Sequence, residues 1–356
     1  MKFANLFLLP LTEAVFFVSC NSDDDNAPQL PLGAYDNGFL VLNQGNFGTS
    51  NSNVSFISSD FATQQNGIFN IVNPTVTMGD TGQDIAFNEN LAFIVLNGSN
   101  SIQVVNRYTF EHVTTITSGL SNPRYIAFAN GKGYVTNWGN ATVTTDDFVA
   151  VLDLTSYAVT ATIPVVEGPE RIIEENNILY VAHQGGYGYG NSVSVISAAS
   201  NTVTSTIPVA DVPNSIDVED GFLYVLCGGK AAWTEDETNG ALYQINLNGN
   251  QVTTYNFTAG NHPSNLVIED NKIYYTVDSD IFVKTISAEL PTQPLFSTTS
   301  QGVYGVYSFA VEDNKIYVGD AGDYNSNGKA YVYSLTGSLQ NEFTVGVIPA
   351  GFYFND

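Results

Sequence analysis

A proline followed eleven residues later by a tyrosine recurs along this chain without any change of spacing. The four pairs are Pro123–Tyr134, Pro169–Tyr180, Pro213–Tyr224 and Pro263–Tyr274. An aliphatic residue stands eight positions before each tyrosine, and the same step links Phe309 to Tyr317, where the proline is missing. Repetition at a period of about 40 to 50 residues is typical of propellers and solenoids. The fold is therefore constrained before any single residue is interpreted.

Each repeat carries the signals of four short antiparallel strands. In the copy from Pro123 to Pro164, residues 124–129 alternate in polarity and Asn130-Gly131 favours a tight hairpin turn. A returning strand, a polar loop and two more β-rich segments follow. Four antiparallel strands per unit describe one propeller blade. No segment has a clear helical period, so we expect almost no helix.

The two ends of the chain are predicted to share a blade. Phe39 matches the aromatic position of the repeat but lacks an upstream half, and Pro349 and Phe352 supply that half at the other end. A strand at about residues 351–354 should therefore pair with residues 38–42. Counting this composite blade, residues 36–356 are predicted to form an all-β, seven-bladed β-propeller of four-stranded antiparallel blades, closed by its N- and C-terminal strands.

The N-terminus has the pattern of an export signal. Lys2 precedes an apolar run that is too short to span a bilayer stably, so residues 1–19 are predicted to be a signal peptide. Cys20 resembles the lipidated cysteine of bacterial lipoproteins, and the acidic residues after it resemble the surface-export signal of Bacteroidetes lipoproteins. Residues 20–35 would then be a lipidated flexible linker that holds the protein at the outer membrane, exposed on the cell surface. The alternative is an ordinary cleaved signal.

Net charge argues against two classes of partner. The chain has 35 acidic and 10 basic residues, a formal charge of −25. Nucleic acids and anionic membrane surfaces require clustered Lys and Arg, so we expect no nucleic-acid partner and membrane contact only through the lipid anchor.

Several motifs resemble a known family. The YVTN tetrapeptide at residues 134–137 is similar to that of the YVTN family of seven-bladed propellers. Segments 38–57 and 318–334 resemble a Bacteroidetes group of propeller surface lipoproteins, the BtuG-like group. That resemblance implies capture of a small nutrient, such as cobalamin or a ferric siderophore, and its delivery to a TonB-dependent outer-membrane transporter.

Propeller topology places the long loops on one face. They fall at residues 43–52, 138–147, 183–191, 227–240 and 319–329. Their aromatic side chains are candidate ligand contacts, because aromatic rings on loops of a rigid scaffold suit flat or glycan-like ligands. These residues are Phe47, Trp138, Tyr187, Tyr189, Trp233 and Tyr324. The alternative is that the rings only pack the loops.

Two of the three arginines, Arg124 and Arg171, follow blade-start prolines and should lie at the mouth of the axial channel. Arg suits bidentate recognition of carboxylate or phosphate, so both are candidate contacts for anionic groups. The alternative is pairing with Glu170, Asp146 or Glu167.

Metal binding has one candidate. Asp323, Asn325 and Asn327 fit the opening of a calcium loop, although Ser334 stands where the twelfth-position Glu is needed. Turn chemistry explains these residues equally well. No cofactor is therefore expected, with calcium as the alternative.

Catalytic motifs are lacking. The three histidines, His112, His183 and His262, lie in different repeats without metal-ligand spacing, and no nucleophile elbow or phosphate loop is present. We predict a binding protein that is not an enzyme. The alternatives are a propeller hydrolase or lactonase that uses His183 or His262 with a loop carboxylate, and a scaffold that contacts surface proteins or glycans.

Overall fold

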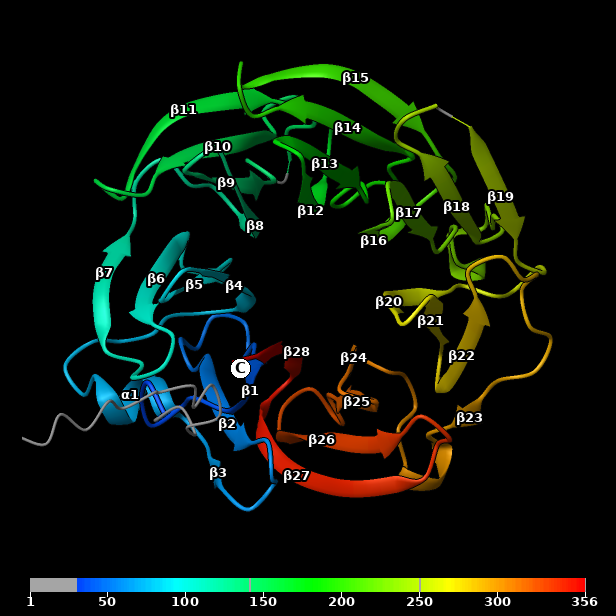
Figure 1. The fold of residues 1–356 in the computed structure, drawn as a ribbon. Helices are drawn as coiled ribbons and strands as arrows, with labels where there is room; N and C mark the ends of the chain where they lie inside the picture. Colours follow the sequence, from blue (N-terminus) through cyan, green and yellow to red (C-terminus); the bar gives the residue numbers. More distant parts are fainter. Residues whose placement is uncertain (1–30, 141, 250, 356) are drawn as a thin grey trace, which may run out of the picture. The chain divides into compact units, whose positions relative to one another are not determined.

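The computed structural model describes residues 31–140, 142–249 and 251–355. The predicted signal peptide, Cys20 and most of the predicted linker lie outside these residues. The unit of residues 32–356 consists of seven four-stranded antiparallel sheets in a ring (Figure 1), which confirms the seven-bladed β-propeller. No helix in the described part of the chain has both the length and the apolar character needed to cross a membrane.

The blades are numbered along the chain, and the strands of each blade follow in order from the innermost to the outermost. Blade 1 contains β28 (Pro349–Phe354), β1 (Gly38–Asn43), β2 (Asn53–Ser58) and β3 (Gln64–Gln65). Blade 2 contains β4 (Gly82–Asn88), β5 (Leu91–Leu96), β6 (Ser101–Asn106) and β7 (His112–Ile116). Blade 3 contains β8 (Pro123–Ala129), β9 (Lys132–Asn137), β10 (Phe148–Asp153) and β11 (Ala158–Pro164). Blade 4 contains β12 (Pro169–Glu175), β13 (Ile178–His183), β14 (Ser192–Ser197) and β15 (Thr202–Pro208).

The remaining blades follow the same plan. Blade 5 contains β16 (Pro213–Glu219), β17 (Phe222–Cys227), β18 (Ala241–Asn246) and β19 (Val252–Asn256). Blade 6 contains β20 (Ser264–Glu269), β21 (Lys272–Val277), β22 (Asp280–Thr285) and β23 (Phe296–Ser297). Blade 7 contains β24 (Ser308–Glu312), β25 (Lys315–Asp320), β26 (Asn327–Ser334) and β27 (Leu339–Val347). The helical segments are short: α1 (Ile68–Val72) and the 3-10 turns η1 (Ala232–Thr234) and η2 (Thr299–Gln301).

The recurring tyrosine packs one blade against the next. Tyr134 is fully buried among side chains of blades 3 and 4, and its hydroxyl donates to the carbonyl of Ala198 (3.1 Å) and to Oδ1 of Asn201 (2.8 Å). The hairpin turn before it has the conformation that the sequence predicts, since φ is 49° at Asn130 and 70° at Gly131. The repeat therefore encodes a strand pair and its contact with a neighbouring blade.

The ring closes as the sequence predicts. β28 pairs with β1, with Phe354 opposite Phe39 and Phe352 opposite Val41. Asn355 reinforces the closure, because its buried side-chain amide donates to the carbonyls of Tyr35 (2.5 Å) and of Arg107 (2.8 Å) in blade 2. Tyr35, the last residue of the predicted linker, is itself buried in the core of the propeller.

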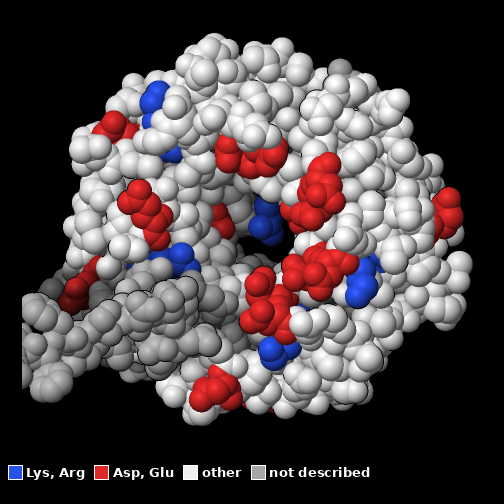
Figure 2. Space-filling view, viewed as in Figure 1, with Lys and Arg blue, Asp and Glu red and all other residues white. Residues whose placement is uncertain are grey.

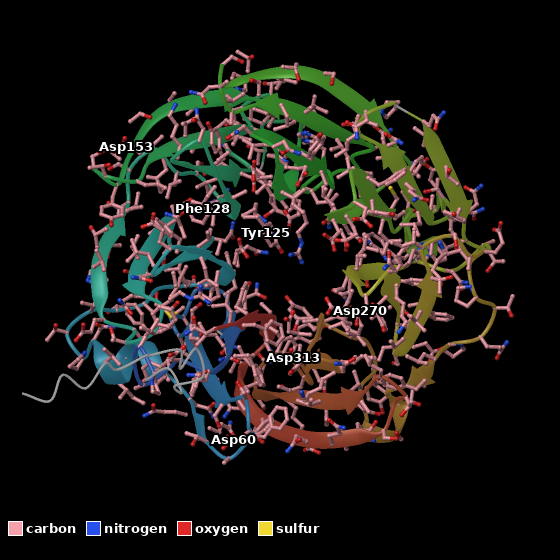
Figure 3. All side chains as sticks on the ribbon, in the orientation of Figure 1. Asp60, Tyr125, Phe128, Asp153, Asp270 and Asp313 are labelled. Carbon is pink, nitrogen blue, oxygen red and sulfur yellow. The ribbon has the colours of Figure 1, made fainter. Side chains whose placement is uncertain are left out.

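Loop length differs between the two faces. We call the face that carries the connections between the second and third strands of each blade the loop face. These connections are long in blades 1, 3, 4, 5 and 7, at residues 44–52, 138–147, 184–191, 228–240 and 321–326, and short in blades 2 and 6. The opposite face, called the hairpin face, carries the tight turns between first and second strands. Asp270 and Asp313 belong to two such turns and lie close to the central opening (Figure 3).

Candidate functional site

The loop face carries large aromatic side chains that are open to solvent. Phe47, Tyr187 and Trp233 are 83%, 79% and 81% exposed, and Tyr189 and Tyr324 are also exposed. Each comes from one of the long loops, so the scaffold holds them on one side of the ring. Several exposed aromatic residues on one face are typical of a binding surface, because their area is otherwise left in contact with water.

Trp138 is more enclosed than these residues. The Arg124 guanidinium lies 4.0 Å from the centre of its ring, and the Tyr187 ring meets it edge-on at 6.2 Å between centroids. Its indole nitrogen is buried, and no hydrogen-bond acceptor for it is found in the described ranges. Trp138 therefore has one face packed against a cation and one unused donor.

Arg124 is paired within the protein. Its Nε and Nη2 each donate to a carboxylate oxygen of Glu170 at 2.8 Å, and both side chains are largely buried. The bond joins β8 of blade 3 to β12 of blade 4. Arg124 thus positions Trp138 and links two blades, and its fork is already satisfied.

Arg171 has a different environment. It lies in the next blade, in β12, with its guanidinium 4.2 Å from the ring centroid of Tyr125. Tyr125 borders the central opening (Figure 3). In residues 31–140, 142–249 and 251–355, no hydrogen bond or ion pair of the Arg171 side chain is present.

The structure adds a tyrosine cluster that the sequence analysis missed. Tyr304, 92% exposed, and Tyr324 line a cavity of about 190 Å³ together with Asp320. Tyr307 meets the Tyr324 ring edge-on at 5.8 Å and donates from its hydroxyl to Gln44 Oε1 at 2.6 Å. Burial raises the pKa of Tyr307 to about 12. The signal for this cluster is the start of blade 7, where two tyrosines flank Val306 in the position of the missing proline.

The predicted calcium residues form a turn that satisfies its own carboxylate. Asp323 Oδ1 accepts from the backbone amides of Asn325 (2.9 Å) and Ser326 (2.7 Å), and Oδ2 accepts from the Ser326 hydroxyl (3.0 Å). These hydrogen bonds hold the pKa of Asp323 below its usual range. Across the described residues, no group of three or more His, Cys, Asp or Glu side chains is arranged to hold a metal ion.

The two loop-face histidines differ in access. His183 is fully buried, its Nε2 lies 2.8 Å from Ser194 Oγ, and burial lowers its pKa to about 4. A substrate on the surface therefore has no direct contact with it. His262 is partly exposed, with Nδ1 2.8 Å from the Gly228 carbonyl and Nε2 3.4 Å from Glu237 Oε1. Of the two, only His262 has the carboxylate neighbour that a hydrolase would need.

A family model described as "Domain of unknown function (DUF5074)" matches residues 37–345 of the chain. No curated protein matches the sequence. Among solved structures, a quinonprotein alcohol dehydrogenase-like protein from Bacteroides thetaiotaomicron VPI-5482 is 16% identical with a TM-score of 0.66, over 90% of this chain and 79% of that chain. A functionally unknown protein from Desulfotomaculum acetoxidans DSM 771 is 13% identical with a TM-score of 0.63, over 90% and 100% of the two chains. At these identities the likeness concerns the fold alone.

Proposed function

The chain belongs to the DUF5074 family, and we propose that its propeller is a capture protein that binds a small nutrient on the loop face. The observation that carries this proposal is the set of exposed aromatic side chains on four of the long loops of that face. Flat rings with polar tips bury much ligand area at a low cost in conformational entropy. The cavity between Tyr304 and Tyr324 supplies two such rings beside the Asp320 carboxylate.

The nutrient class and its destination rest on the resemblance of segments 38–57 and 318–334 to the BtuG-like group. We propose cobalamin, a ferric siderophore or a ligand of similar size. A lipid on Cys20 would hold the propeller at the outer-membrane surface, where a TonB-dependent transporter receives the ligand. A leash of this kind raises the local concentration of the capture protein at the transporter without requiring a tight protein–protein interface.

The burial of His183 favours a binding function over hydrolysis. The His183 ring is enclosed, while several aromatic rings of the loop face are exposed. The hydrolase alternative rests on His262 and Glu237. Turnover of a lactone that disappears in His262→Ala would replace the capture proposal with that alternative.

Tryptophan fluorescence can report ligand binding at the loop face. Both tryptophans of the chain, Trp138 and Trp233, lie on loop-face loops. We expect at least one of cyanocobalamin, haem and a ferric siderophore to change the emission saturably, with a Kd below about 1 µM. Trp233→Phe should remove the part of the response that comes from the exposed ring.

The control for this titration is free tryptophan at the same absorbance, which corrects for light absorbed by the coloured ligands. A response that matches free tryptophan for all three ligands would contradict capture of these nutrient classes. A saturable response that survives in both Trp138→Phe and Trp233→Phe is expected, because each variant keeps one reporter on the face.

A further inference from the structure

Arg171 carries a positive charge that the described protein groups do not neutralise by direct contact. Its guanidinium stacks on Tyr125 at 4.2 Å, which uses the π face of the cation and leaves its N–H groups unused. In the described part of the chain these donors have neither a hydrogen-bond acceptor nor an ion-pair partner. A partly buried cation without an acceptor is unfavourable, so such a site favours an anion from outside.

Arg124 provides an internal comparison. It is the other arginine that follows a blade-start proline, and its fork is fully engaged by Glu170 in two bonds of 2.8 Å. Glu170 is the chain neighbour of Arg171, but its carboxylate pairs with Arg124 in β8, whereas the Arg171 guanidinium lies on the Tyr125 ring of the same strand. The acceptor next to Arg171 in the sequence is therefore already used.

The groups around Arg171 supply few acceptors. Asp84 is buried, and its oxygens accept from the Ile126 amide (3.1 Å) and from the Tyr353 hydroxyl (3.3 Å). Burial raises the pKa of Asp84 to about 6, although the nearby Arg171 charge acts against this shift. The Tyr125 hydroxyl accepts from Gln83 Nε2 at 2.9 Å. Each of these oxygens thus has a donor other than Arg171.

The hairpin face is unfavourable for the entry of an anion. Glu219, Glu269, Asp270 and Asp313 lie at the end of, or in the turn after, the innermost strands of blades 5, 6 and 7. Burial, followed by the charges of the other three carboxylates, raises the pKa of Glu269. Figure 2 shows acidic side chains around the central opening and basic surface within it. A mouth lined by one sign of charge repels ions of that sign. An anion therefore has its easier path from the loop face, past the exposed aromatic rings.

We propose that Arg171 binds an oxyanion, a carboxylate or a phosphate group, that enters the central channel from the loop face. The planar fork of the guanidinium can donate two parallel hydrogen bonds to two oxygens of one such group, and the stack on Tyr125 holds the fork in a fixed orientation. This inference rests on the proposed function only for the identity of the ligand that carries the oxyanion group. Binding of the group at Arg171 does not depend on it. The inference makes the captured nutrient an acidic compound that presents a carboxylate or phosphate.

Calorimetric titration with inorganic phosphate and with benzoate tests the site without knowledge of the nutrient. We expect both probes to bind the wild-type propeller at low salt and Arg171→Gln to weaken binding by about tenfold or more. Arg171→Lys should retain phosphate better than benzoate, because an ammonium is a point charge without a planar fork. Lys272→Gln, at the hairpin face, is the matched control: it removes the same charge and should bind both probes like the wild type.

Thermal unfolding separates this role from a structural one. Without added anion, Arg171→Gln should melt close to the temperature of the wild type, because the substitution breaks no hydrogen bond, and the loss of the stack on Tyr125 is offset by removal of an unpaired, partly buried cation. Phosphate should raise the melting temperature of the wild type and leave that of the variant unchanged. The proposal is overturned if the wild type binds neither probe, if Arg171→Gln binds them equally well, or if this variant melts well below the wild type. Loss of anion binding alongside an intact fluorescence response to a nutrient would remove this site and leave the capture function standing.

Discussion

At the scale of single residues, buried titratable groups make the stability of the propeller depend on pH in two directions. Asp217 lies in β16, and its Oδ2 accepts from the Ile268 amide of β20 in the next blade at 3.1 Å. Burial raises the pKa of Asp217 to about 6, so its stabilising contribution is complete below about pH 4 and is lost as the pH rises through 6. Burial lowers the pKa of His183 to about 4, so its contribution is present above about pH 6.5 and is lost as the pH falls through 4.

Asp217→Asn separates these effects. The amide oxygen of Asn can still accept from Ile268, but the side chain no longer ionises. Between pH 4 and pH 7 the free energy of unfolding should therefore fall less in the variant than in the wild type, by about 1–2 kcal/mol after allowance for partial exposure. Urea unfolding at several pH values measures this difference. Asp220→Asn, in an exposed turn of the same blade, is the matched control, and an equal effect of both substitutions would contradict the account.

Pairing between residues is the part that the sequence predicts least. The blade-start prolines placed Arg124 and Arg171 at the inner strands of neighbouring blades, as the structure has them. Glu170 is next to Arg171 in the sequence but pairs with Arg124, while Arg171 stacks on Tyr125. Both contacts join β12 to β8 of blade 3, and a register shift between Pro169 and Ile172 interrupts the simple alternation of β12 at these two residues. The pairing of Arg124 with Glu170 depends on how two neighbouring blades pack, because the two residues are 46 positions apart in the sequence.

At the scale of elements, the closing strand β28 is the point at which the ring depends on both chain ends. Phe352 is buried in the core between blades 7 and 1, with its ring 6.2 Å from Phe39 and 5.8 Å from Tyr317. β28 also contacts the inner strands β24 and β4 on its two sides. Loss of packing in β28 therefore weakens both neighbours, and closure removes edges that would otherwise pair with other chains.

Phe352→Ala should lower the free energy of unfolding by about 3 kcal/mol, because a large buried ring is replaced by a cavity. Chemical denaturation measures this loss. Phe47→Ala is the matched control: the same substitution at a ring that is 83% exposed should change stability by less than about 0.5 kcal/mol. Equal losses in the two variants would contradict the stabilising role assigned to the buried Phe352 ring of β28.

Closure was predictable from the sequence because the repeat shows which half of a blade is missing at each end. The outer strands were less predictable from the sequence. β3 and β23 are only two residues long, and their segments, Gln64–Gln65 and Phe296–Ser297, follow no clear alternation. Outer strands are partly exposed, so the hydrophobic pattern that marks the inner strands is weak there.

At the scale of the whole molecule, the propeller has two unlike faces. One carries long loops with exposed aromatic rings, and the other carries short turns with carboxylates around the opening (Figure 2). The period of the repeat predicts the blades and the side on which each loop lies, since both follow from strand order. It does not predict the cavity at Tyr304 and Tyr324, because loops of blades 7 and 1 meet there through Tyr307 and Gln44.

The central claim, capture of a small nutrient by the loop face, is tested most directly by calorimetric titration of the wild type and of Tyr304→Ala/Tyr324→Ala with cyanocobalamin, haem and a ferric siderophore. Both tyrosines are exposed, so the double variant should unfold at the same temperature as the wild type. We predict that at least one ligand binds the wild type with a Kd below about 1 µM and binds the double variant about tenfold more weakly. The claim is contradicted if none of the three binds, or if the double variant binds as tightly as the wild type.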